Sequence, residues 1–114
     1  MVSVIIPTYN RSETLVRAIK SVLKQTFKDF ELIVVNDGST DDTCRVIESI
    51  NDPRIKSITR PNLGVSSARN LGIWNSSGTF LSFLDSDDEW MPSKLEKQLE
   101  TLEDNPDYAP NSED

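Results

Sequence analysis

The chain has 114 residues, 36% of them hydrophobic, which is enough for one small domain with a single core but not for two domains. Its 19 acidic and 12 basic residues give a formal charge of -7, opposite to the basic surface of a nucleic-acid binder, and that class is set aside. One cysteine, Cys44, cannot form an intramolecular disulfide, and no apolar run approaches the roughly 20 residues that span a bilayer. We therefore expect a cytoplasmic domain with no membrane segment in this chain, located at the cytoplasmic face of a membrane if a longer protein carries an anchor.

Strand and helix patterns alternate along the first half of the chain. The β-branched run 2–6 predicts a buried strand, and apolar residues at helical spacing from Ser12 predict a helix of about three turns, capped by Asn10 and Glu13. A second strand is predicted over 30–36. Ser39 with Asp42 has the spacing of an N-terminal cap, which predicts a second helix directly after them.

The second half continues this alternation. Residues 54–59 form a weaker strand candidate, 65–75 a helix and 79–84 a fourth strand, and a last helix has Pro92 near its first turn and ends near residues 105–106. Such alternation implies right-handed crossovers and a mostly parallel, Rossmann-like α/β sheet with helices on both faces. Ligands bind such sheets beyond the carboxyl ends of the strands, which directs attention to the loops 7–10, 36–41 and 85–89.

The acidic loop is the most informative of the three. Asp85 and Asp87 stand where an apolar strand ends, so their carboxylates can enter one crevice, where repulsion must be relieved by a cation or by hydrogen-bond donors. Oxygen ligands suit Mg²⁺ or Mn²⁺, and an ion held by one or two carboxylates keeps positions open for the oxygens of a diphosphate. The alternative is the approach to a helix N-terminus, where the helix dipole favours acidic residues. Composition alone does not separate the two interpretations.

Other side chains also have a functional and a structural interpretation. The Asp37 carboxylate, at a strand end, could accept a hydrogen bond from the imide N–H of a base. Tyr9 could stack on a base, but covering the end of the sheet is the better interpretation of Tyr9 alone. Arg69 could bind a base carbonyl or a phosphate, against a surface ion pair. Gly64 and Gly72 are interpreted as a turn and a close-packing site.

Four segments occur in a characteristic order: VIIPTYN at 4–10, VVNDGSTD at 34–41, the pattern NxGxxxARNxG at 62–72, and DxDD at 85–88. Together they resemble the successive signatures of glycosyltransferase family 2, whose members are inverting enzymes of the GT-A fold. The resemblance covers nearly the whole chain. It implies that residues 1–106 form the N-terminal nucleotide-diphospho-sugar-binding half of that fold, truncated before the acceptor site, and that 107–114 form a disordered tail.

The resemblance also implies a ligand set. The donor is a sugar nucleoside diphosphate, most often UDP-linked, and the cofactor is Mn²⁺ or Mg²⁺, which would neutralise charge on the departing diphosphate. By motif, Asp37 bonds the base, Asp85 lies near the ribose or the metal, and Asp87 is the direct metal ligand. The donor-binding residues implied in this way are Pro7, Thr8, Tyr9, Asp37, Arg69, Asp85 and Ser86.

The carboxylate general base of an inverting transfer has no candidate here, so we assign no catalytic residue and expect the chain alone to be inactive. The parent enzyme is expected to act in cell-envelope polysaccharide synthesis. A non-catalytic nucleotide or nucleotide-sugar binding module is the competing hypothesis, whereas a dinucleotide-dependent oxidoreductase is disfavoured because no G-x-G-x-x-G follows the first strand. Apolar residues such as Trp74, Trp90 or Phe83 should remain exposed, which predicts a homodimer or a larger assembly.

Overall fold

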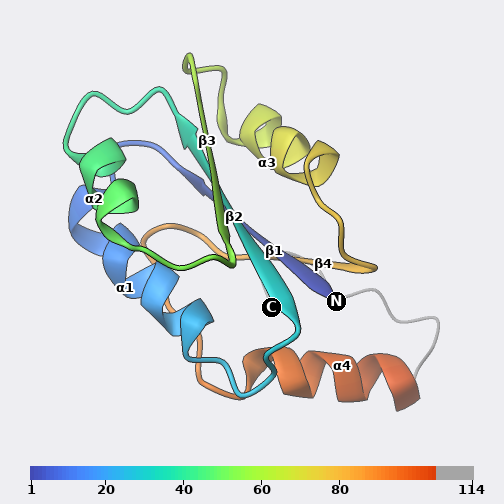
Figure 1. The fold of residues 1–114 in the computed structure, drawn as a ribbon. Helices are drawn as coiled ribbons and strands as arrows, with labels where there is room; N and C mark the ends of the chain where they lie inside the picture. The colour runs from blue at the N-terminus through green and yellow to red at the C-terminus, as the bar shows by residue number, and fades with distance from the viewer. Residues whose placement is uncertain (105–114) are drawn as a thin grey trace.

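The structure, a computed structural model, describes residues 1–104 of the chain (Figure 1). The predicted tail at 107–114 and the predicted helix end near 105–106 lie outside these residues. Every strand and helix predicted from the sequence is present within them, with boundaries that differ by a few residues. The order of elements is β1 (Val2–Thr8), α1 (Ser12–Leu23), β2 (Phe30–Asp37), α2 (Thr43–Ser49), β3 (Ile55–Arg60), α3 (Val65–Trp74), β4 (Phe80–Phe83) and α4 (Lys94–Asp104).

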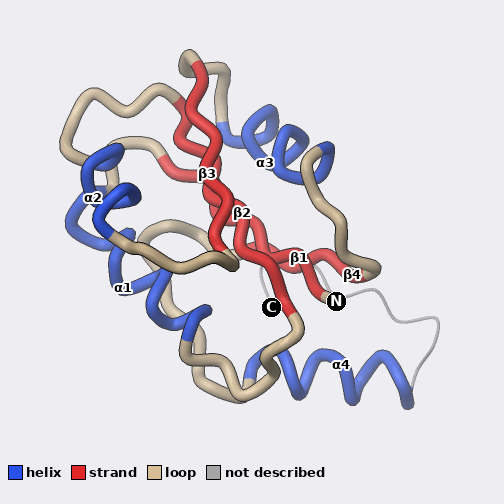
Figure 2. The backbone as a smooth tube through the Cα atoms, in the orientation of Figure 1, coloured by secondary structure: helices blue, strands red, loops and turns tan. Residues whose placement is uncertain are grey.

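The four strands form one parallel sheet in the order β3-β2-β1-β4. Helices α1, α2 and α4 lie on one face of this sheet and α3 lies on the other, as Figure 2 shows. The predicted α/β, Rossmann-like fold with helices on both faces is therefore confirmed. No helix among residues 1–104 is both long enough and apolar enough to cross a bilayer.

The alternation of side chains along β1 divides the core into two layers. Val4 and Ile6 belong to the buried cluster under α1, α2 and α4, whereas Ile5 belongs to a smaller cluster under α3. In that smaller layer α3 lies very close to the sheet, because a Cβ built on Gly72 would be 2.5 Å from Cγ2 of Ile5. This confirms Gly72 as a close-packing site.

The chain changes direction at β1. It runs outward from β1 through β2 to β3 over helices on one face, and α3 then crosses the other face to place β4 on the far side of β1. Neighbouring strands whose connections leave in opposite directions create a crevice at their carboxyl ends. In this sheet the crevice lies between β1 and β4.

Pro7 fits this crevice because of the register of the strands. β1 pairs with β2 through Thr8 but with β4 only as far as Ile5 and Phe83. Ile5 O accepts from Leu84 N, so the odd-numbered residues of β1 direct their backbone polar groups toward β4. Pro7, the next odd residue, lies past the last β1–β4 pair, and its missing N–H removes no bond of the ladder.

The helix caps differ from the sequence expectation. The residues before α1 and α2 are Arg11 and Asp42, and neither side chain caps its helix. The predicted caps Asn10–Glu13 and Ser39–Asp42 are therefore wrong. The reason is that the two loops bind each other: Thr40 N donates to Asn10 Oδ1 at 2.8 Å, and Asn10 N donates to Ser39 Oγ at 2.9 Å.

Of the aromatic residues expected to be exposed, Trp74 is 85% exposed at the end of α3. Trp90 and Phe83 are instead half-buried, because each packs against the margin of one core layer. The expectation of exposed apolar surface is thus correct for Trp74 and wrong for the other two.

A buried carboxylate ties the sheet together at its amino end. Glu31 Oε2 accepts from Ser3 Oγ and from Ser77 N, both at 2.6 Å, and its Oε1 lies 2.9 Å from Lys56 Nζ. These contacts join β2 to β1, to β3 and to the segment that leads into β4. Burial by itself raises the pKa of Glu31, but the donors from Ser3, Ser77 and Lys56 outweigh it and hold the pKa below its usual value.

We predict that Glu31→Gln lowers the free energy of unfolding by about 1 to 3 kcal/mol at neutral pH, since one amide cannot replace the carboxylate for all three donors. A lowered folded-state pKa means that the stabilisation is present above about pH 4.5 and is lost as the pH falls through the folded value. Urea unfolding between about pH 7 and pH 3 should therefore show a flatter acid dependence in the variant. Glu100→Gln, at an exposed position of α4, is the control. Parallel curves for Glu31→Gln and the parent chain would contradict this role.

Candidate functional site

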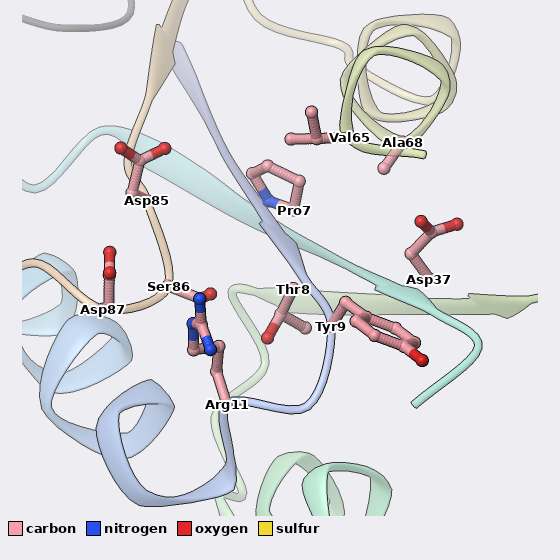
Figure 3. A pocket seen from close by; sticks show the side chains of 10 residues that line it. All are labelled: Pro7, Thr8, Tyr9, Arg11, Asp37, Val65, Ala68, Asp85, Ser86 and Asp87. Atoms are coloured by element: carbon pink, nitrogen blue, oxygen red, sulfur yellow. The ribbon is translucent and has the colours of Figure 1, made fainter. Parts of the chain in front are cut away.

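A pocket of about 330 Å³ lies at the carboxyl end of the sheet, where β1 and β4 diverge. This volume is within the usual range for small-molecule sites. Figure 3 shows Asp37 on one side of the pocket and Asp85 and Asp87 on the opposite side. The residues that line it are Pro7, Thr8, Tyr9, Arg11, Asp37, Val65, Ala68, Asp85, Ser86 and Asp87.

The structure thus brings together all but one of the residues implicated by the sequence. The exception is Arg69, which follows pocket residue Ala68 on α3 and whose Nη2 lies 3.4 Å from Asp85 Oδ1. The surface ion pair considered as its structural interpretation is therefore present, and it is made to a residue of the pocket itself. Arg69 borders the pocket without lining it.

Asp37 has a structural role that the sequence did not reveal. Its Oδ1 accepts from Arg60 Nε and from Leu63 N, and its Oδ2 accepts from Gly64 N, all at 3.0 Å. Burial alone raises the pKa of Asp37, but these donors together hold it below its usual value. The carboxylate therefore fixes the turn before α3, and Oδ2 keeps capacity for a second donor.

Arg60 completes this network. Its Nη1 donates to Ser67 Oγ at 2.8 Å and its Nη2 to Gly64 O at 3.1 Å, while the same guanidinium pairs with Asp37. Gly64 has a φ of 100°, which allows the chain to turn into α3 and confirms the predicted turn. The first turn of α3, which supplies Val65 and Ala68 to the pocket, is thereby held against the end of β2.

The acidic loop is held from the other side by a polar stripe on α1. Thr14 Oγ1 donates to Ser86 O at 2.9 Å, and Arg17 Nη2 donates to Asp87 O at 3.3 Å. About one turn further along, Ser21 Oγ accepts from Trp90 N at 3.1 Å, and just beyond the end of α1, Gln25 Nε2 donates to Met91 O at 2.7 Å. These side chains bind the backbone of the segment. Of the loop carboxylates that line the pocket, only Asp85 has an ion pair within residues 1–104, with Arg69.

Two buried polar atoms at this site have no hydrogen-bond partner within residues 1–104. They are Oγ1 of Thr8, which lines the pocket, and Nε of Arg69 beside it. Buried polar atoms in folded proteins are nearly always hydrogen-bonded. Thr8 Oγ1 therefore stands out among the polar atoms of the residues that line this pocket.

The residues also fit a divalent cation. No group of three or more acidic, histidine or cysteine side chains in the described part of the chain could hold a metal by itself. Asp85 and Asp87 nevertheless line one pocket, and Mg²⁺ in phosphate-handling sites is usually bound by one or two carboxylates with the substrate's phosphates completing the shell. The donor set therefore suits an ion that arrives together with a diphosphate.

Sequence reasoning missed three pocket residues: Arg11, Val65 and Ala68. Arg11 could have been found, because a cation directly after the first predicted strand and loop lies at the edge of the sheet where ligands bind. Val65 and Ala68 carry no chemical signal. They line the pocket only because the Asp37–Arg60 network draws the start of α3 to the end of β2.

Comparison with known proteins identifies the family of the chain. The family model described as Glycosyl transferase family 2 matches residues 3–111. The chain belongs to this family. The family 2 chain is 51% identical over 105 residues to an uncharacterized glycosyltransferase of Rickettsia bellii, covering 91% of the chain and 15% of that protein. It is 43% identical over 103 residues to the Escherichia coli UDP-Glc:alpha-D-GlcNAc-diphosphoundecaprenol beta-1,3-glucosyltransferase WfgD, covering 90% of the chain and 41% of that protein.

Among solved structures, Staphylococcus aureus TarS 1–349 in complex with UDP-GlcNAc matches the family 2 chain with a TM-score of 0.86 and 32% identity. The match covers 92% of this chain and 32% of the TarS 1–349 chain. The family 2 chain thus spans less than half the length of each of these relatives, so what they bind and transfer bears on it only as a proposal.

We predict that Arg60→Gln destabilises the family 2 chain by about 3 kcal/mol, because it leaves Asp37 buried without its cationic partner. The measurement is urea unfolding at neutral pH. Arg45→Gln, at an exposed position of α2, is the matched control and should leave the midpoint nearly unchanged. Equal midpoints for Arg60→Gln and Arg45→Gln would show that Arg60 does not organise this end of the sheet.

Proposed function

We propose that the chain is the donor-binding domain of an enzyme that transfers a sugar from a UDP-sugar to an acceptor hydroxyl, with inversion and with Mn²⁺ or Mg²⁺. The observation that carries the proposal is a single pocket at the divergence of β1 and β4 that collects the predicted base-binding and metal-binding side chains. Membership of glycosyl transferase family 2 supports a transferase, and the UDP-GlcNAc complex of TarS supports a uridine donor.

The two sides of the pocket suit the two ends of such a donor. On one side, Asp37 Oδ2 accepts only one hydrogen bond and can take another from the imide of uracil, next to the half-exposed ring of Tyr9. On the other side, Asp85 and Asp87 would hold the divalent ion. That ion would supply Lewis-acid neutralisation of the leaving diphosphate.

Two arginines complement the charge that develops in the reaction. As the acceptor oxygen bonds to the anomeric carbon, the bond from that carbon to the diphosphate breaks and negative charge grows on the diphosphate. The Arg11 guanidinium lines the pocket and has no ion pair within residues 1–104, so it is free to bind a phosphate oxygen. Arg69, which pairs with Asp85, can stabilise the same negative charge from the α3 side of the pocket.

The acceptor belongs to the same proposal. The name of WfgD describes transfer of glucose to an undecaprenol-linked acceptor. We extend this class of acceptor to the parent enzyme, which places it in cell-envelope polysaccharide synthesis. Cytoplasmic location stays a prediction.

The test is a calorimetric titration with UDP, uridine and ADP, with and without Mn²⁺. UDP should bind more tightly than ADP, and Mn²⁺ should tighten UDP far more than uridine, which has no diphosphate to bridge. Without the ion, two unit charges about 4 Å apart repel by roughly 4 kcal/mol at an effective dielectric near 20, which is enough to decide whether binding is detected.

Asp87→Asn should remove most of the gain from Mn²⁺ and leave uridine binding nearly unchanged. Asp88→Asn is the matched control, because Asp88 lies in the same loop and is exposed but does not line the pocket. The metal role is wrong if chelation leaves the affinity for UDP unaltered. An affinity for ADP equal to that for UDP would sink the assignment of Asp37.

We also propose that the chain self-associates through the edge of β4. Trp74, Ile73 and Phe80 are 85%, 39% and 42% exposed, and they flank the connection from α3 to this edge strand. An unpaired strand edge beside exposed apolar side chains favours association. Sedimentation velocity at high concentration should show a dimer that Trp74→Ser weakens and Met91→Ser, at another exposed apolar residue, does not. A monomer at every concentration would refute this assembly.

A further inference from the structure

A second hollow of the surface lies outside the donor pocket, along the outer side of α1. It is an open groove of about 700 Å³ between α1 and the segment 89–92, which connects the acidic loop to α4. Figure 1 shows this segment running beside α1. Three cations and two carboxylates are among the residues that line it, which are Glu13, Val16, Arg17, Lys20, Ser21, Lys24, Glu89, Trp90, Met91 and Pro92. None of them is among the residues assigned to the donor.

The charge of this region is opposite to that of the chain. Residues 11–28 contain five basic side chains and one acidic side chain, a net charge of +4, whereas the whole chain has a formal charge of -7. The rest of the sequence therefore carries -11. An anionic partner is therefore attracted more strongly to the residues around α1 than the net charge of the chain would suggest.

Two of the three cations of the groove are available for an external partner. Arg17, Lys20 and Lys24 are all exposed, and their spacing places them along one side of α1. Neither Lys20 nor Lys24 has an ion pair within residues 1–104, whereas Arg17 Nε lies 3.6 Å from Glu89 Oε1. Two lysine ammonium groups thus make no ion pair within the described residues, although Glu13 and Glu89 line the same groove.

The opposite wall is apolar and is held in a fixed position. Met91 is 76% exposed and Trp90 is half-buried. The backbone of Trp90 is bound by Ser21 of α1, and that of Met91 by Gln25, just after this helix. The Met91 side chain is therefore presented outward by a tethered segment, directly beside the lysines. Free cations next to a protruding apolar side chain match the boundary between anionic headgroups and acyl chains in a bilayer.

We propose that this groove is a docking surface for the surface of an anionic phospholipid bilayer. The cations of α1 bind the headgroups, and Met91 with Trp90 enters the headgroup boundary. An acidic protein partner is less well matched, because an acidic surface offers no apolar contact for the exposed Met91 side chain. The docked face borders the donor pocket, since Arg17 donates to the backbone of pocket residue Asp87. The inference does not depend on the donor being UDP.

The test is cosedimentation of the 114-residue chain with vesicles of pure phosphatidylcholine and with vesicles that also contain phosphatidylglycerol. We expect binding only to the anionic vesicles, and weaker binding at high salt. Each lysine removed should lower the partition coefficient about fivefold, so Lys20→Gln/Lys24→Gln should lower it about 25-fold. The control Arg45→Gln/Lys97→Gln removes two exposed cations from other helices and should have little effect.

A spectroscopic readout locates the contact. In a Trp74→Phe background, Trp90 is the only tryptophan, and its emission should shift to the blue on anionic vesicles and lose that shift in Met91→Ser/Lys20→Gln/Lys24→Gln. Equal binding to neutral and anionic vesicles, or no loss in Lys20→Gln/Lys24→Gln, would overturn the proposal. So would polyglutamate that binds as tightly as the vesicles without shifting Trp90, which would indicate an acidic protein partner. Retained UDP affinity in the lysine variants separates this result from the fate of the proposed function.

Discussion

The reversal of chain direction at β1 is the constraint on which the rest of the site depends. β2 and β4 lie on opposite sides of β1 in the sheet. The connections that follow β1 and β4 therefore do not cross the gap between their carboxyl ends, and this space stays open. Pro7 maintains this opening, since it offers no N–H to an extended β4. The position of the pocket is thus a property of topology and register, and the side chains in it determine only what it binds.

Two unrelated polar networks then bring flexible segments to this opening. On the α3 side, the buried pair Asp37–Arg60 fixes a turn that would otherwise be free, and it costs desolvation that several hydrogen bonds offset. On the α1 side, neutral and charged side chains bind the backbone of the acidic loop and make no hydrogen bond or ion pair with the carboxylate of Asp87. In the first network, Asp37 both fixes the turn and faces the pocket. In the second, the residues that hold the loop are different from Asp87, which faces the pocket. Substitutions of Asp37 will therefore mix losses of stability and of binding, and substitutions of Asp87 will not.

Much of this could be predicted from the sequence. The spacing of apolar residues, together with the turn residues, predicts every strand and helix of residues 1–104. The rule that ligands bind beyond the carboxyl ends of the strands selects the three loops that the structure brings to one pocket. Three features were not predicted correctly, and they have one cause. They are the helix caps, the role of Arg60 and the contact of Val65 with the pocket. Each depends on contacts between segments about 20 to 30 residues apart, such as Asn10 with Thr40 and Asp37 with Arg60, which no local spacing encodes. Ser39 has the right spacing for a cap, but its Oγ accepts a hydrogen bond from Asn10 N of the neighbouring loop instead.

The polar stripe on α1 has a consequence for which changes of length this chain can accept. Thr14, Arg17 and Ser21 reach one stretch of backbone because they share a side of α1, and Gln25, just after the helix, extends the row. One inserted or deleted residue near the start of this helix would rotate the side chains on either side of it by about 100° relative to each other. Some tethers would then point away from the acidic loop while the apolar core lost its register. Homologous sequences should therefore keep a constant number of residues between Thr14 and Ser21.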